Sequence, residues 1–174
     1  TMDEEYNTCS PLSVDTFIQG IEDEKNVFQG ATAKAWVLWD EEAIYVYMEV
    51  NDPVLSDISD TVYMQDSIEV FIDENNGKTT FYEEDDGQFR VSYKNRQSFG
   101  STGSVDGFES ATRTTEDGYA VEVKIPYRTL TPQDGTVIGF DLQVNDDQGS
   151  GVRDSIAKWN DPTNDSWQST AGFG

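Results

Sequence analysis

The chain has 174 residues, enough for one domain with a hydrophobic core, and its 36% hydrophobic and 12% aromatic content is typical of a globular β protein. Its net charge of −23 argues strongly against nucleic acid as a partner, since that affinity comes from lysine and arginine on phosphates. No apolar run reaches about 18 residues, so we expect neither a membrane span nor a membrane partner. Histidine is absent, which makes triad hydrolases, zinc peptidases and histidine-ligated haem domains poor candidates.

The pattern of apolar residues predicts short strands and almost no helix. Residues 1–30 are polar and weakly patterned, with one candidate strand at 16–21. From Lys34 onward apolar residues recur with a period of two, as in a strand with one buried face. We expect strands around residues 36–38, 44–50, 68–72, 89–93, 119–125, 138–144 and 156–159. Weaker patterns predict a short strand at Phe81, after the Asn76-Gly77 turn signal, and one helical turn at 127–130.

Many short strands separated by turn residues are typical of antiparallel sandwiches. The sequence therefore predicts an all-β fold, namely an antiparallel β-sandwich of the jelly-roll or immunoglobulin-like type. It shows no internal repeat, low-complexity tract or linker, so we expect a single domain over residues 1–174.

The same alternation identifies polar side chains that point away from the core. Glu69 lies between apolar neighbours at 68, 70 and 72, and Arg90 and Gln143 hold the equivalent place in two other strands. If these strands belong to one sheet, a carboxylate, a guanidinium and an amide converge on one face. Together they supply the acceptors and donors that vicinal hydroxyls need. A solvated outer face with ordinary ion pairs remains the alternative.

Trp167 lies in a polar segment near the end of the chain, K-W-N-D-P-T-N-D-S-W-Q-S-T-A-G-F-G, outside any apolar run. A large ring in such a segment is either part of a loop that folds back onto the core or one wall of a ligand site. A flat apolar ring beside hydrogen-bonding groups is what a sugar ring needs. Tyr63 is a candidate for a second wall, and Asp52 and Asn164 lie at the expected rim.

Five segments of the chain together resemble the family 9 carbohydrate-binding modules, which are found appended to secreted xylanases and related cell-surface enzymes. The segments are D-P-V-L (52–55), Q-D-S-I-E-V-F-I-D-E-N-N (65–76), Q-F-R-V (88–91), V-I-G-F-D-L-Q-V-N-D (137–146) and W-N-D-P-T-N-D-S-W (159–167). They occur in the same order as in the family, which makes the match more specific than one short motif.

The resemblance implies a β-sandwich without catalytic activity. It implies a blind slot that takes the terminal sugar, typically the reducing end, of β-glucans and xylans between two aromatic rings. The implied ligands are glucose, xylose, cellobiose, xylo-oligosaccharides and the chain ends of cellulose and xylan. One ring matches Trp167; the other, a tryptophan in most members, is Tyr63 here. The polar partners of the sugar carry over onto Asp52, Glu69, Arg90, Gln143 and Asn164.

The resemblance also implies a setting and a metal. The module would be part of a larger, extracellular or cell-surface-attached multidomain glycoside hydrolase, which it targets to plant cell-wall polysaccharide. Structural calcium is expected, and the hard oxygen ligands that flank the turn after residue 72 are the candidates: Asp73, Asn75, Asn76, Asp85 and Asp86. The spacing is not that of an EF-hand, so a solvated acidic turn is the alternative.

Two other classes of function fit the composition. A calcium-dependent cell-surface adhesion module would share the sandwich and the acidity but would lack a sugar slot. A small glycoside hydrolase would use Glu69 and Asp52 as its carboxylate pair. Against the second, Arg90 is an expected neighbour of Glu69 and would keep it ionised, which is unsuitable for a general acid.

Overall fold

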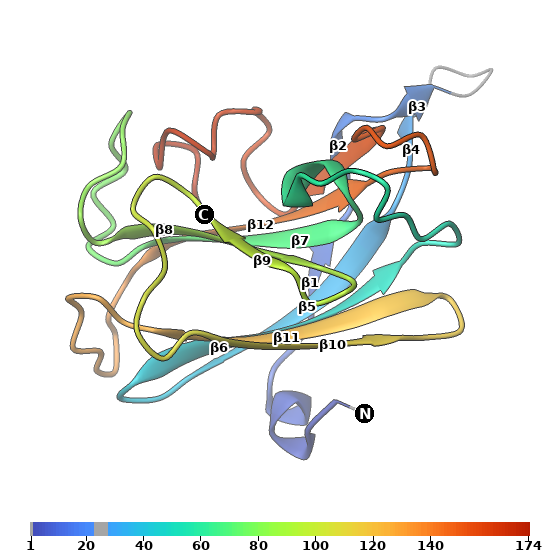
Figure 1. The fold of residues 1–174 in the computed structure, drawn as a ribbon. Helices are drawn as coiled ribbons and strands as arrows, with labels where there is room; N and C mark the ends of the chain where they lie inside the picture. Colours follow the sequence, from blue (N-terminus) through green and yellow to red (C-terminus); the bar gives the residue numbers. More distant parts are fainter. Residues whose placement is uncertain (1, 23–27) are drawn as a thin grey trace.

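The computed structural model describes residues 2–22 and 28–174, which form a sandwich of two antiparallel sheets. One sheet has five strands in the order β1 (Leu12–Val14), β5 (Thr32–Trp39), β6 (Ala43–Asn51), β11 (Gly118–Pro126) and β10 (Glu109–Thr114). The other has six strands in the order β2 (Thr16–Gln19), β13 (Ser155–Lys158), β12 (Gly139–Asp146), β7 (Ser67–Asp73), β8 (Asp86–Ser92) and β9 (Gln97–Phe99). Figure 1 shows the two sheets facing each other. The predicted all-β sandwich is confirmed.

Four short elements complete the described fold. A 3-10 turn, η1 (Glu4–Thr8), precedes β1, and a second, η2 (Val62–Met64), precedes β7. Strands β3 (Ile21–Glu22) and β4 (Phe28–Gln29) pair as a separate ribbon. No helix among residues 2–22 and 28–174 is long and apolar enough to cross a membrane.

The core lies between the sheets and is made by the alternating residues of their central strands. Ile68, Val70 and Ile72 of β7 face the core, as the period of two predicts. Strands β6, β11 and β12 contribute the equivalent positions at 44–50, 119–125 and 140–144. In β5, however, the alanines and Val37 face the core, so Trp36 and Leu38 lie on the opposite face, where they pack on Tyr6 and Tyr47.

Two local predictions are wrong, and both segments instead make irregular contacts. Phe81 is not in a strand, because the neighbouring backbone of Thr79 pairs with Thr170 of the C-terminal loop rather than with a sheet. Residues 127–130 form no helical turn, because the carboxylate of Glu74 accepts the successive backbone N–H groups of residues 128–130. Elements η1 and β1 were not predicted, because the apolar pattern of residues 1–30 is weak.

Strands β7 and β12 are buried on both faces, which determines where polar chemistry can occur. Every residue of the two strands is buried. The face of the six-stranded sheet that points away from the core therefore carries polar side chains under a cover of loops. Figure 1 shows η2 and the C-terminal loop on this side of the sheet.

Candidate functional site

Strand register brings together the three polar residues that alternation identified. Glu69 of β7 is the direct partner of Gln143 of β12 on one side and of Arg90 of β8 on the other. Directly paired residues of antiparallel strands point to the same face. The strands do belong to one sheet, and the three side chains form a row across it. This face is not solvated at its centre, because Glu69 is only 2% exposed and Gln143 only 4%.

Glu69 is the acceptor around which the row is organised. Its carboxylate accepts hydrogen bonds from the side-chain amides of Gln88 (2.6 Å), Asn145 (2.8 Å) and Gln143 (3.3 Å). The Arg90 guanidinium lies 3.9 Å away. These groups fix the carboxylate and compensate its burial, as a charge removed from water requires.

Arg90 is held in place from the other side by strand β9. Its Nε donates to the hydroxyl of Ser98 at 2.8 Å, and its Nη2 donates to the carbonyl of Phe99 at 2.7 Å. The side chain is 13% exposed and lines a cleft, so part of it still reaches the surface. A donor fixed in this way is available to a ligand without a large loss of rotamer entropy.

Above the row lies a cleft of about 800 Å³. Six of the seven residues predicted to hold a sugar line it: Tyr63, Glu69, Arg90, Gln143, Asn164 and Trp167. Tyr63 is 39% exposed and Trp167 is 57% exposed, so both large rings stand at the surface and not in the core. A concave site that combines aromatic side chains with a small number of placed polar groups is typical of small-ligand binding sites.

Tyr63 lies near two cationic side chains. The guanidinium carbons of Arg90 and Arg153 lie 5.7 Å and 5.8 Å from the centre of its ring, within cation–π distance. Arg153 also donates to Asn145 at 3.2 Å, and burial lowers its pKa. Sequence reasoning missed Arg153, because it lies in an irregular loop that has no period to reveal its direction.

Two other lining residues were missed for different reasons. Gln88 lies two positions before Arg90 in the same strand, so the alternation that identified Arg90 could also have identified Gln88. Tyr82 lies in the irregular segment where a strand was expected. Its hydroxyl donates to the carbonyl of Ser166, next to Trp167.

The loop that carries Trp167 is fastened to the sheet by a buried lysine. Lys158 of β13 is 0% exposed, and its ammonium lies 2.8 Å from a carboxylate oxygen of Asp141 and 3.6 Å from one of Asp161. It also donates to the hydroxyl of Ser166, which in turn donates to Asp161 at 2.7 Å. A buried charge needs such complete pairing, and here the pairing ties Ser166, the residue before Trp167, to the sheet.

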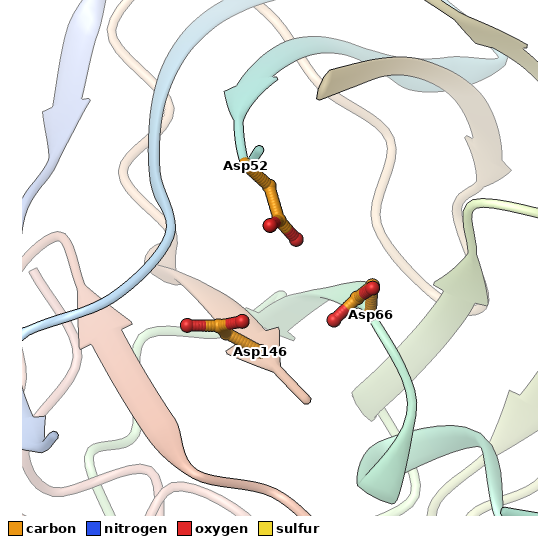
Figure 2. A group of neighbouring side chains, drawn as sticks. All are labelled: Asp52, Asp66 and Asp146. Carbon is orange, nitrogen blue, oxygen red and sulfur yellow. The ribbon is translucent and has the colours of Figure 1, made fainter. Parts of the chain in front are cut away.

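Asp52 is the one predicted sugar ligand that does not line the cleft. It lies at the end of β6, is 1% exposed, and faces the carboxylates of Asp66 and Asp146 (Figure 2). The direction of a residue at a strand end is not set by alternation, because the chain turns there at Pro53. The pair Glu69 and Asp52 that a hydrolase would need is therefore not in one cleft.

Three of the five residues predicted to bind metal lie close together in the acidic turn. Single carboxylate oxygens of Asp73, Asp85 and Asp86 lie within 4.8 Å of one another, and all three residues are buried. Asn75 donates its backbone N–H to Asp85 at 3.0 Å, and Asn76 turns the chain with a φ of 53°. Burial raises the pKa of Asp86 to about 6. The oxygen-only donor set is one that a hard cation could bind.

Comparison with protein families places the whole chain in one group. The sequence model described as "Carbohydrate family 9 binding domain-like" matches residues 1–174. Endo-1,4-beta-xylanase A of Thermoanaerobacterium saccharolyticum is 48% identical over 99% of this chain, which spans 14% of that protein. Exoglucanase XynX of Acetivibrio thermocellus is 46% identical over 99% of this chain, which spans 15% of that protein. The chain thus matches only a small part of these curated relatives.

Two solved structures share the fold over the full length of the chain. Both are of a carbohydrate-binding module of family 9 from Caldicellulosiruptor kristjanssonii, one in complex with cellotriose and one with glucose. They are 33% identical to this chain, cover 100% of it, and superpose with TM-scores of 0.90 and 0.89. The chain covers 84% and 86% of those structures.

Proposed function

The chain belongs to the family 9 carbohydrate-binding modules, and on this premise we propose that it holds the terminal sugar of β-glucans and xylans in the cleft between Tyr63 and Trp167. The observation that supports this most strongly is the convergence of six expected residues on one cleft, drawn from η2, three strands and the C-terminal loop. A homologous module binds cellotriose and glucose, which are ligands of the proposed class.

In the proposed complex the sugar lies flat between the two rings with its hydroxyls on the polar row. Glu69 accepts from adjacent hydroxyls, and Arg90, Gln143 and Asn164 donate to hydroxyl and ring oxygens. Each charged hydrogen bond contributes about 1.5–3 kcal/mol and each neutral one about 1 kcal/mol. Ordering costs offset several kcal/mol, so we expect a Kd between about 1 μM and 1 mM.

Trp167 is the decisive residue for a mutational test, and Trp39 is its matched control. Both are exposed tryptophans, 57% and 52% respectively, but Trp39 lies at the end of β5 in the other sheet. We expect Trp167→Ala to abolish calorimetrically detectable binding of cellobiose and xylobiose, and Trp39→Ala to leave it unchanged. Unchanged affinity in Trp167→Ala would remove this ring from the site.

Recognition of the reducing end is the finer part of the proposal. An end-binding slot must reject a sugar whose anomeric carbon has been reduced to an open alditol. We expect borohydride-reduced cellobiose to bind at least tenfold more weakly than cellobiose. Equal binding of the two would favour a groove that runs along the chain instead.

We also infer the setting in which the module acts. Residues 1–174 would act as one non-catalytic module of a secreted or cell-surface multidomain glycoside hydrolase, because the curated relatives are xylanases and an exoglucanase of which it matches a small part. Glu69 has no second carboxylate among the residues that line the cleft, which supports a binding role over hydrolysis. Release of reducing sugar from xylan or cellulose by the purified chain would contradict it.

Calcium is the cofactor that we propose for the acidic turn, where Asp73, Asp85 and Asp86 would supply carboxylate oxygens. Their mutual repulsion in a buried position favours a bound hard cation. Asp73→Asn should therefore weaken the stabilisation of the chain by calcium, measured as the change in Tm on adding a chelator. A Tm that does not respond to chelator in the native chain would refute stabilising calcium.

A further inference from the structure

The lining of the cleft has a charge opposite in sign to that of the chain as a whole. The chain has 34 acidic and 11 basic residues, which give a net charge of −23. Among the residues that line the cleft, one is acidic, Glu69, and two are basic, Arg90 and Arg153. The lining therefore carries a formal charge of +1. A local excess of positive charge in so acidic a chain favours a ligand that carries a negative charge.

The carboxylate of Glu69 is compensated without Arg153. It accepts hydrogen bonds from three side-chain amides, and the guanidinium of Arg90 forms its ion pair at 3.9 Å. Arg153, in contrast, takes part in none of the ion pairs found among residues 2–22 and 28–174. The guanidinium of Arg153 stays charged at any ordinary pH. Its positive charge is therefore the one in the cleft that remains for a ligand.

Most of the hydrogen-bond donors of Arg153 are also available. A guanidinium has five N–H groups. Within the part of the chain that the structure describes, the side chain of Arg153 makes one hydrogen bond, from Nη1 to the side-chain oxygen of Asn145 at 3.2 Å. The residue is half-buried, and none of its nitrogens is among the buried atoms without a partner in the same residues. The remaining N–H groups of Arg153 therefore reach the solvent in the cleft that it lines.

The loop of residues 147–154, between β12 and β13, holds Arg153 in position. Its backbone carbonyl accepts a hydrogen bond from the side-chain amide of Gln19 at 2.7 Å. Within the loop, Asp147 accepts the backbone N–H groups of residues 150 and 151 at 2.7 Å and 2.9 Å, and Asp154 accepts that of Gln148 at 2.9 Å. Hydrogen bonds at the backbone and at the guanidinium thus restrain this side chain before a ligand binds. A restrained donor loses less conformational entropy on binding than a free one.

A carboxylate is the anionic group that matches these donors. Its two oxygens can accept two parallel N–H bonds from one guanidinium. Its single negative charge equals the formal charge of the lining in size, whereas a phosphate group, with a charge of about −1.5 to −2, would exceed it. An excess of negative charge is unfavourable in a chain whose net charge is already −23. On a hexose, a carboxylate in place of the exocyclic CH2OH group makes a uronic acid.

We propose that the cleft binds uronic acids in preference to the matching neutral sugars, and that Arg153 is the residue that selects them. The guanidinium of Arg153 pairs with the carboxylate of the sugar, while the hydroxyls of the same sugar bind to the row of Glu69, Arg90 and Gln143. This inference rests on the proposed function, because it requires that a sugar occupies the cleft. It adds a charge preference to that function and assigns the preference to one residue.

D-Glucuronate and D-glucuronamide are the ligands that isolate this preference, because they share their ring and hydroxyls and differ in the charge of one group. We would titrate both, together with D-glucose, into the native chain by calorimetry at pH 7, in a buffer that contains no carboxylate. A hydrogen bond to a charged group is stronger than a neutral one, although partial exposure to solvent reduces the difference. We expect glucuronate to bind about three- to tenfold more tightly than glucuronamide.

Variants of Arg153 separate selection of the carboxylate from a structural role. In Arg153→Gln the affinities for glucuronate and glucuronamide should become about equal, whereas Arg153→Lys, which keeps the charge but not the fork of donors, should retain part of the preference. A structural role alone, through the contact with Tyr63, would weaken both ligands and glucose alike and leave the ratio unchanged. Arg113→Gln is the matched control, because it removes the same charge from β10, outside the cleft, and should not change the ratio.

The outcomes distinguish this inference from the function on which it rests. If glucose binds but glucuronate binds no more tightly than glucuronamide, the charge preference is refuted and the proposed function stands. A preference that persists unchanged in Arg153→Gln would overturn the role of Arg153. If glucose, cellobiose and glucuronate all fail to bind the native chain, the proposed function fails and the charge preference fails with it.

Discussion

Replacement of Lys158 tests how the loop that carries Trp167 is held on the sheet. Lys158→Met keeps the aliphatic length of the side chain but removes the ammonium from between Asp141 and Asp161, which are 0% and 2% exposed. Removal of one partner from a buried ion pair costs about 3–5 kcal/mol, because the other charge stays buried. For a chain of this size the corresponding fall in Tm is roughly 6–20 °C. Thermal and urea unfolding followed by circular dichroism measure both quantities.

Two comparisons make this prediction specific. Lys124→Met removes an exposed pair with Glu109, whose side chains are 31% and 74% exposed, and should change stability by less than about 1 kcal/mol. Addition of Asp141→Asn to Lys158→Met should recover part of the loss, because it neutralises the carboxylate that the lysine had paired. A loss below about 1 kcal/mol in Lys158→Met, or no recovery in the double variant, would refute the reasoning.

Three further predictions concern the cleft and the buried acids. Tyr63→Trp should tighten cellobiose binding about two- to fivefold in calorimetry, because a larger ring offers more stacking surface; weaker binding would show that the phenol is fitted to its ligand. Glu69→Gln should weaken cellobiose binding at least tenfold, because an NH2 group would then face the amide donors that now converge there, whereas Glu109→Gln, which is outside the cleft, should have no effect. In chelator, stability should fall as pH rises from about 4 toward 7–8, because burial raises the pKa of Asp52 to about 7 and of Asp66 to about 8, so the folded chain binds more protons than the unfolded chain in this window. Asp52→Asn should make this slope shallower. A Tm that rises with pH over this range in the native chain would contradict the raised pKa values of Asp52 and Asp66.

The strands could be predicted from the sequence because apolar residues at every second position mark the buried face of a strand. The faces of β7, β8 and β12 followed from apolar residues at every second position, and with them the outward direction of Glu69, Arg90 and Gln143. Alternation could not show that this outer face is buried. That burial comes from loops, which fold over the sheet without any period of their own.

The parts that sequence reasoning missed all depend on contacts between distant segments. Arg153 reaches Tyr63 from a loop, and Lys158 compensates Asp141 across two strands. Asp52 was expected at the sugar, but a strand end can turn to either side, and here it turns toward Asp66 and Asp146. Trp167 and Tyr63 were candidates from their polar surroundings, but only the resemblance to a family favoured walls of a cleft over rings that pack under loops.

The fastening of the C-terminal loop has a consequence for the kinetics of recognition. Because Ser166 is held by Lys158 and Asp161, the backbone that leads into Trp167 is positioned before a ligand arrives. If the cleft takes a sugar as proposed, association should need no slow rearrangement of this loop, and its rate should be that of encounter and orientation. If the module binds chain ends as proposed, it would release one end and capture another rapidly, as attachment of an enzyme to a polysaccharide that is being degraded would require.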